Sequence, residues 1–93
     1  MQDIEFEWDD RKNRANNAKH GVSFEEAVKV FDDPFHLSMP DDTHSDDEER
    51  WITVGRMKGG RVILVVHTDR GNAVRLISAR PATRRERKEY EEK

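Results

Sequence analysis

Residues 50–80 read RWITVGRMKGGRVILVVHTDRGNAVRLISAR, and this stretch decides the fold. It contains three runs rich in apolar and β-branched residues, at 50–57, 61–68 and 73–80, separated by KGG and by DRGN. Short separators rich in Gly, Asn and Asp are typical of hairpin turns, so the runs predict an antiparallel meander. The middle run contains VILVV, which is apolar at every position, and we expect it to be the central strand with both faces covered.

The last of these runs alternates in character, so a period of two assigns its side chains to two faces. The expected faces are Arg75, Ile77 and Ala79 on one side and Val74, Leu76, Ser78 and Arg80 on the other. Arg75 is thus expected among apolar neighbours, where an unpaired guanidinium is costly and needs an anionic partner.

A strand and a first helix are expected before the meander. Residues 4–8, IEFEW, alternate apolar and acidic side chains, as a short half-buried strand does. Asp9 or Asp10 can then cap a helix over residues 11–19, which Gly21 would close in the left-handed conformation. The apolar face of this helix has only two alanines, so we expect it to lie largely exposed or to pack through the stems of its long side chains.

A second helix is expected directly afterwards. Ser23 and Glu26 form the S-x-x-E pattern of a capping box. The apolar residues behind it fall at helical spacing on one face, namely Phe24, Ala27, Val28 and Phe31. Asp33-Pro34 would end this helix, and residues 34–49 are expected to form a loop.

Thr83 and Glu86 repeat the capping-box pattern and predict a charged helix near the C-terminal end. The predicted order is therefore β-α-α-β-β-β-α, a small α+β domain with an antiparallel sheet. A length of 93 residues fits one domain over residues 1–93, and the lack of cysteine excludes disulfides.

The formal net charge of −3 conceals a strong asymmetry. Residues 50–80 contain seven Lys and Arg and a single Asp, whereas residues 41–49 contain six acids and no Lys or Arg. The basic half suggests a polyanionic partner, although these side chains can equally solvate the exposed edges of strands. No apolar run reaches the length of a signal peptide or a membrane span, so we expect a cytoplasmic protein without membrane contact.

Three blocks of this sequence together resemble the BrnT family, the toxins of type II toxin–antitoxin pairs. They are KHGVSFEEA at 19–27, GGRVILVVHTDRG at 59–71 and SARPATRRERKEYE at 78–91, in the order and spacing of that family. The resemblance implies a RelE-like α+β fold and RNA cleavage without a metal or other cofactor. It also implies a ribbon-helix-helix antitoxin, BrnA, that binds the toxin and carries it to operator DNA.

RNA can be cut without a metal because its 2′-hydroxyl is an internal nucleophile. The enzyme then needs a base, an acid and cations around the phosphate. Arg75 is the first candidate, as a ligand of the scissile phosphate; the alternative is a salt bridge to Glu5, Glu7 or Glu25. His67, at the end of the central strand, titrates near neutral pH and is a candidate acid or base, unless it only hydrogen-bonds the following turn.

Three further residues near the two helices are candidate catalytic groups. Lys19 and His20 match the KHG of the family block and suit a general base or a phosphate contact. The alternative is that they only complement the dipole at a helix C-terminus. Glu25 is a candidate general base, whereas Glu26 is better explained as the acid of the capping box.

Four residues are candidates for binding the RNA chain. Arg61, Arg80 and Arg84 can hold the sugar–phosphate backbone without reading sequence, although a solvated cationic edge explains them as well. Trp8 can stack on a base, but a tryptophan at a strand end is more often part of the core.

A metal centre and the common nucleotide-binding motifs are not predicted. His36 and His44 stand among acids in the expected loop, but their spacing matches no pattern of metal ligands. The competing function is a non-catalytic binding module that acts only within a regulatory complex. Such a module would lose affinity gradually as arginines are removed, whereas an enzyme would depend on single residues.

Overall fold

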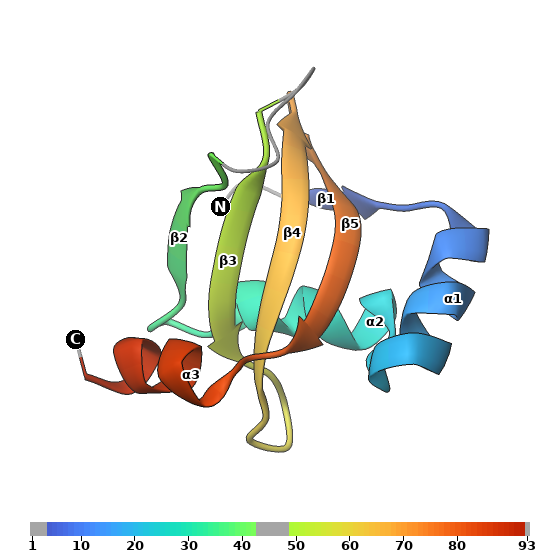
Figure 1. Ribbon diagram of the computed structural model, residues 1–93. Helices are drawn as coiled ribbons and strands as arrows, with labels where there is room; N and C mark the ends of the chain where they lie inside the picture. Colours follow the sequence, from blue (N-terminus) through green and yellow to red (C-terminus); the bar gives the residue numbers. More distant parts are fainter. Residues whose placement is uncertain (1–3, 43–48, 93) are drawn as a thin grey trace.

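The computed structural model describes residues 4–42 and 49–92 as a five-stranded sheet with helices on both of its faces (Figure 1). The elements in chain order are β1 (Glu5–Glu7), α1 (Asp10–His20), α2 (Phe24–Ala27), the 3₁₀ helix η1 (Val28–Asp32), β2 (Leu37–Pro40), β3 (Trp51–Arg56), β4 (Val62–Arg70), β5 (Ala73–Pro81) and α3 (Arg84–Glu91). None of the helices in this part of the chain is long and apolar enough to cross a membrane.

The strands lie in the order β1-β5-β4-β3-β2. The α+β class is confirmed, as are the meander of β3, β4 and β5 and the central place of β4. Two expectations were wrong. The segment expected as a loop contains the edge strand β2, which pairs antiparallel with β3, and β1 pairs parallel with β5, so the sheet is mixed. The observed order is β-α-α-β-β-β-β-α, with η1 continuing the second helix.

Local chemistry explains where the helices begin and end. The Asp9 side chain accepts hydrogen bonds from the N–H groups of Arg11 and Lys12, and Gly21 closes α1 at φ 71°. Both predicted capping boxes are present, at the start of α2 and at the start of α3.

The second helix differs from the regular helix that its apolar spacing predicts. Only Phe24–Ala27 is α-helical, and the chain then tightens into η1. The tighter winding turns Val30 fully into the core, while Val28 and Phe31 are only partly buried against it.

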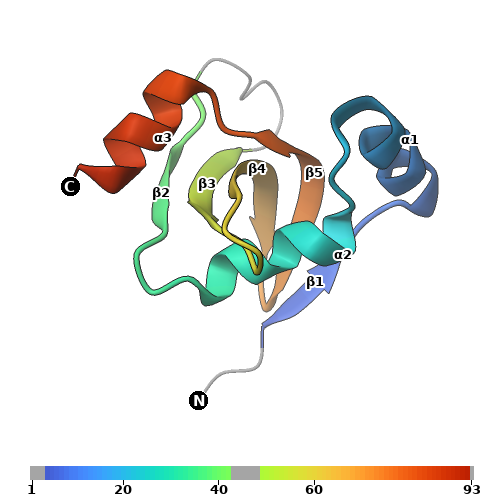
Figure 2. The ribbon, with the colours of Figure 1, turned by 90° about the horizontal axis from the view of Figure 1, so that it is seen from below.

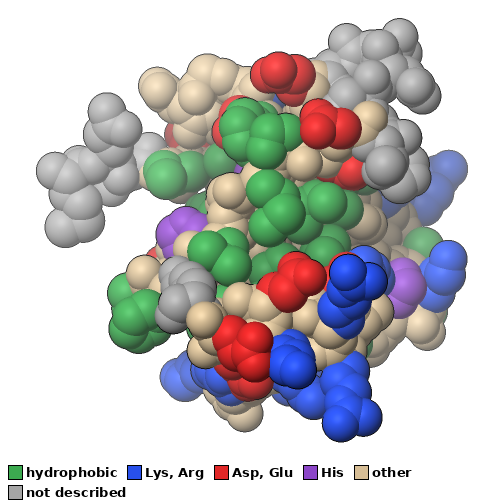
Figure 3. Space-filling view, turned by 60° about the vertical axis from the view of Figure 1, so that its left-hand side comes forward, with side chains coloured by type: hydrophobic (Ala, Val, Ile, Leu, Met, Phe, Trp, Pro, Cys, Tyr) green, Lys and Arg blue, Asp and Glu red, His purple; other side chains and the backbone are tan. Residues whose placement is uncertain are grey.

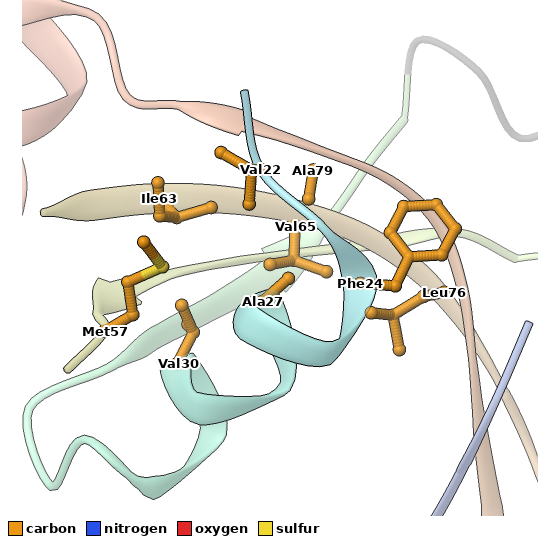
Figure 4. Close-up of a cluster of buried hydrophobic side chains, with 9 residues drawn as sticks. All are labelled: Val22, Phe24, Ala27, Val30, Met57, Ile63, Val65, Leu76 and Ala79. Atoms are coloured by element: carbon orange, nitrogen blue, oxygen red, sulfur yellow. The ribbon is translucent and has the colours of Figure 1, made fainter. Parts of the chain in front are cut away.

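Helices α2 and α3 lie on opposite sides of the sheet (Figure 2). Each face of the sheet has its own apolar cluster. We call the face covered by α2 and η1 the α2 face, and the opposite one the α3 face. The cluster on the α2 face comprises Val22, Phe24, Ala27, Val30, Met57, Ile63, Val65, Leu76 and Ala79 (Figure 4). The smaller cluster on the α3 face comprises Val54, Val62, Leu64 and Tyr90. Successive β4 residues enter the two clusters alternately, as expected for a central strand.

Helix α1 lies largely exposed, as expected, and the contacts that it makes with the rest of the domain are polar. Its two buried residues are Asn13 and Asn16. Asn16 donates to the carbonyl oxygens of Val22, at 2.9 Å, and of Ala79, at 2.8 Å. Asn13 accepts a hydrogen bond from the N–H of Phe24 at 2.8 Å. Amide groups thus fasten the helix to β5 and to the start of α2.

Candidate functional site

A β-bulge in β5 changes which of its side chains share a face. Val66 of β4 pairs with Ser78, but the next residue, His67, pairs with Leu76. Ile77 is therefore an extra residue in β5, and the alternation of side chains shifts by one at this point.

The predicted division of β5 into two faces was consequently wrong. Leu76 and Ala79 lie together in the core of the α2 face. Arg75 pairs with Thr68, and Arg80 pairs with Leu64. These two β4 residues, Thr68 and Leu64, lie on the α3 face. The two arginines, expected on opposite faces, therefore leave the sheet on the same face.

Arg75 forms an ion pair with Glu7 of β1. The parallel register places these two residues side by side, and an Arg75 guanidinium nitrogen lies 3.2 Å from Glu7 Oε2. The side chains are 32% and 43% exposed, respectively, so an ion from solvent can reach both. The salt bridge that the sequence offered as one alternative is therefore present, with Glu7 as the partner.

Thr68 stands directly opposite Arg75 in the β4–β5 ladder. Its Oγ1 is buried and has no hydrogen-bond partner among the residues that the structure describes. Buried hydroxyl groups nearly always find a partner, so this unsatisfied hydroxyl beside an exposed ion pair is unusual.

Arg80 is held by α3. Two of its guanidinium nitrogens donate to the two carboxylate oxygens of Glu86, at 2.8 and 2.9 Å. Glu86 also accepts from the N–H of Thr83 at 2.8 Å. The bond to Arg80 and those from Thr83 lower the pKa of Glu86 to about 2, against the opposing effect of burial. Arg80 therefore anchors the first turn of α3 to the sheet.

The other predicted cations gather where α1 ends and β4 begins. Lys19 and His20 form the last turn of α1, and Arg61 reaches back to the carbonyl oxygen of Gly21 at 3.4 Å. On the other side, the N–H of Ala82 donates to the carbonyl of Val62, so Arg84 begins α3 close to Arg61. We call Lys19, His20, Arg61 and Arg84 the cationic edge.

His67 lies on the α2 face and is 4% exposed. Its Nε2 is 2.7 Å from Thr53 Oγ1, its Nδ1 is 3.1 Å from Asp69 Oδ1, and Thr53 is hydrogen-bonded in turn to Ser38 at 2.7 Å. Burial lowers the pKa of His67, although the Asp69 carboxylate opposes this effect. Burial therefore favours the neutral imidazole, which lies in a hydrogen-bonded chain beside Phe31, with the two ring centroids 5.1 Å apart.

Glu25 and Trp8 lie among structural contacts. Glu25 accepts a hydrogen bond from the side-chain amide of Asn13 at 2.7 Å. Trp8 packs edge-on against Phe24, with ring centroids 6.0 Å apart, at the margin of the main core.

The predicted site residues thus form two groups and do not form one centre. Arg75 and Arg80 share the α3 face of β5, and the cationic edge adjoins its C-terminal end. His67, Glu25 and Trp8 lie apart from both groups. Glu7, beside Arg75, was considered only as a salt-bridge partner, because nothing in the sequence shows that β1 joins the sheet next to β5.

No site for a metal ion is apparent in residues 4–42 and 49–92, where no three His, Cys, Asp or Glu side chains lie close enough to hold one together. His44 is outside this part of the chain. What the surface does offer is two guanidinium groups with carboxylates beside them, Glu7 at Arg75 and Glu86 at Arg80. Guanidinium groups bind phosphates, and a carboxylate can accept a proton.

The β2 side of the sheet exposes apolar surface. Hydrophobic side chains gather along the middle of this side, with acidic groups above them and mixed charges below (Figure 3). Leu37, Ile52 and Val66 are only partly buried here, while Met39 and Phe35 are 42% and 63% exposed. An apolar strip beside an edge strand is a typical surface for a protein partner.

Comparison with known proteins identifies the family to which the fold belongs. A family model described as the ribonuclease toxin BrnT of type II toxin–antitoxin systems matches residues 8–86. The fold is similar to the crystal structure of the Brucella abortus ribonuclease toxin BrnT, with a TM-score of 0.69 and 25% identity, over 88% of this chain and 100% of that one. Among curated proteins no match is found. The resemblance inferred from three sequence blocks is confirmed, and the chain belongs to the BrnT family of ribonuclease toxins of type II toxin–antitoxin systems.

Proposed function

We propose that this BrnT-family toxin is a metal-independent endoribonuclease that cuts RNA by attack of the 2′-hydroxyl on the adjacent phosphate. The observation that carries the proposal is the β5 bulge, which places Arg75 and Arg80 on one face of the sheet. The strands that carry these arginines come from residues 50–80, which contain seven Lys and Arg and only one acidic residue.

Arg75 is proposed to bind the scissile phosphate. A guanidinium donates two parallel hydrogen bonds to the non-bridging oxygens and stabilises the charge that accumulates on them in the transition state. This chemistry calls for no metal, because the nucleophile is part of the substrate and side chains can move its proton.

The cationic edge and Arg80 are proposed to bind the RNA on one side of the cleavage point. Arg75 and Arg80 pair with β4 residues four positions apart, which corresponds to about 13 Å along the strand. Contacts of this kind fix the position of the chain without reading its bases. His67, buried on the other face, and Glu25, bonded to Asn13, have no part in this proposal, and neither does Trp8.

The test is cleavage of a short labelled RNA by the purified protein in excess chelator, beside the same RNA carrying 2′-O-methyl groups. We expect cleavage of the first substrate only, with 2′,3′-cyclic phosphate and 5′-hydroxyl ends. Equal cleavage of both, or activity that chelator abolishes, would contradict the mechanism. A folded protein that binds RNA and never cuts it would favour the non-catalytic binding module instead.

The antitoxin partner implied by the family is proposed to be a BrnA-like ribbon-helix-helix protein, and the toxin is proposed to reach operator DNA only through it. The support for a protein interface is the apolar strip beside β2, with Met39 and Phe35 exposed. Met39→Asp should weaken antitoxin binding about tenfold or more, since a charge replaces a buried contact. Ile4→Asp is the matched control, because Ile4 is 55% exposed beyond the opposite edge. Loss of binding in Ile4→Asp alone would move the interface to the β1 edge.

A further inference from the structure

Glu7 is the only carboxylate among residues 4–42 and 49–92 that contacts Arg75. Its own hydrogen bonding in this part of the chain is limited to that guanidinium, and its side chain is 43% exposed. A carboxylate with free lone pairs, held beside a phosphate-binding group, can accept a proton from a hydroxyl next to that phosphate.

We propose that Glu7 is the general base that deprotonates the 2′-hydroxyl, a role that rests on the function proposed above. Glu7 accepts the proton while the 2′-oxygen forms its bond to phosphorus. The bond from phosphorus to the 5′-oxygen breaks, and that oxygen keeps the electron pair and takes a proton from water. A cyclic phosphate and a 5′-hydroxyl result, and Glu7 then releases its proton to solvent.

The other acidic or basic candidates fit this role less well. Glu86 is bound by Arg80 at both oxygens, and the resulting stabilisation of its charge makes it a poor acceptor of protons. His67 is buried on the opposite face, and Glu25 is bonded to Asn13. Glu7 alone in the described ranges combines exposure with a contact to Arg75.

Thr68 supplies a second observation at the same place. Cross-strand neighbours have Cβ atoms about 5 Å apart, so its orphan hydroxyl lies within side-chain reach of whatever Arg75 holds. Thr68 Oγ1 is itself buried in the resting structure, so a phosphate or ribose hydroxyl can reach it only when the side chains around it move. Binding of a phosphate or a ribose hydroxyl at this place would account for the missing hydrogen-bond partner of Thr68.

The test compares Glu7→Gln with Glu5→Gln. Glu5 lies on the same strand and the same side two residues earlier, is exposed, and pairs with Ala73, so the control makes the same charge change away from Arg75. Single-turnover cleavage is measured from pH 5 to 9, and affinity is measured with the uncleavable 2′-O-methyl RNA. Thermal unfolding verifies that each variant is folded.

Glu7→Gln should cleave about 100-fold or more slowly, with RNA affinity within about threefold of wild type. Glu7→Asp, which keeps the carboxylate, should retain part of the rate. Glu5→Gln should match wild type. A Glu7→Gln protein that cleaves within about threefold of wild type overturns the inference alone. A wild type that cuts no RNA overturns the proposed function and the inference together.

Discussion

Asn16 and Ala79, 63 residues apart, exchange two hydrogen bonds: the Asn16 amide donates to the carbonyl oxygen of Ala79 at 2.8 Å and accepts from its N–H at 3.1 Å. The Asn16 side chain thus takes the place of a neighbouring strand. It satisfies the backbone N–H and carbonyl groups of Ala79 at a part of β5 that β1 does not reach. It also donates to Val22, so a single amide joins α1, β5 and the segment before α2.

Replacing Asn16 by Ala should lower the free energy of unfolding by about 2 kcal/mol or more, because buried backbone groups of Ala79 and Val22 lose their partners. Chemical denaturation measures the loss. Asn17→Ala is the control, since Asn17 is the neighbouring exposed residue of the same helix. Equal stability of the two variants would show that water replaces the Asn16 amide at little cost.

Gly55 has no room for a side chain. An added Cβ would lie 2.8 Å from Val30 Cγ1, 3.0 Å from the Val30 carbonyl oxygen and 3.1 Å from His36 Cβ. Gly55→Ala should therefore push η1 away from β3 and cost about 1–3 kcal/mol of stability, measured by urea unfolding. An unfolding midpoint equal to that of wild type would mean that η1 adjusts freely.

Acidification should destabilise the fold through His67. Its pKa is lowered by burial, so the unfolded chain binds a proton more readily than the folded one. The contribution of His67 to stability is then complete above 6.5, the ordinary pKa of histidine, and falls as the pH drops below that value. His67→Gln can still bond to Thr53 but does not titrate, so its loss of stability between pH 7 and 5 should be smaller than that of wild type. If both proteins lose the same amount of stability, a group other than His67 causes the pH dependence.

The pair of Glu86 and Arg80 should matter at lower pH. Because the pKa of Glu86 falls from 4.5 to about 2, its contribution is present above pH 4.5 and lost as the pH falls toward 2. The full shift corresponds to roughly 3 kcal/mol, but Arg80 is 37% exposed, so screening reduces the expected contribution to about 1–2 kcal/mol.

Glu86→Gln should remove most of that contribution at pH 7, as measured by guanidinium denaturation at low salt. Glu89→Gln is the control, because its ion pair with Arg85 is far more exposed, at 67% and 91%. If both variants lose the same small amount of stability, the bond to Arg80 does not anchor α3 as the geometry indicates.

Much of the fold was predictable because local patterns fixed it. Some features depend only on residues close to them in the chain: the all-apolar run of β4, the left-handed Gly21 and both capping boxes. Each of them is found at the predicted position. The sequence blocks shared with the BrnT family added the biochemical class, which no local pattern contains.

The candidate site was less predictable because its geometry depends on long-range pairing. Because of the bulge at Ile77, Arg75 and Arg80 lie on the same face of the sheet, whereas regular alternation would place them on opposite faces. The alternating sequence gives no sign of the extra residue. The partnership of Glu7 with Arg75 follows from the parallel docking of β1, which sequence order does not reveal. The short strand β2 ends in Pro40, so composition alone made it look like a loop.

The most direct test of the central claim, that RNA is cut on the face of the sheet that carries Arg75, is single-turnover cleavage in chelator by Arg75→Ala. The control is Arg85→Ala, because Arg85 is 91% exposed on α3 and carries the same charge. Arg75→Ala should cleave about 100- to 1000-fold more slowly, as expected when a donor to the transition-state phosphate is removed. Arg85→Ala should stay close to wild type. A folded Arg75→Ala protein that cleaves as fast as the Arg85→Ala control would contradict the account and place the chemistry elsewhere on the molecule.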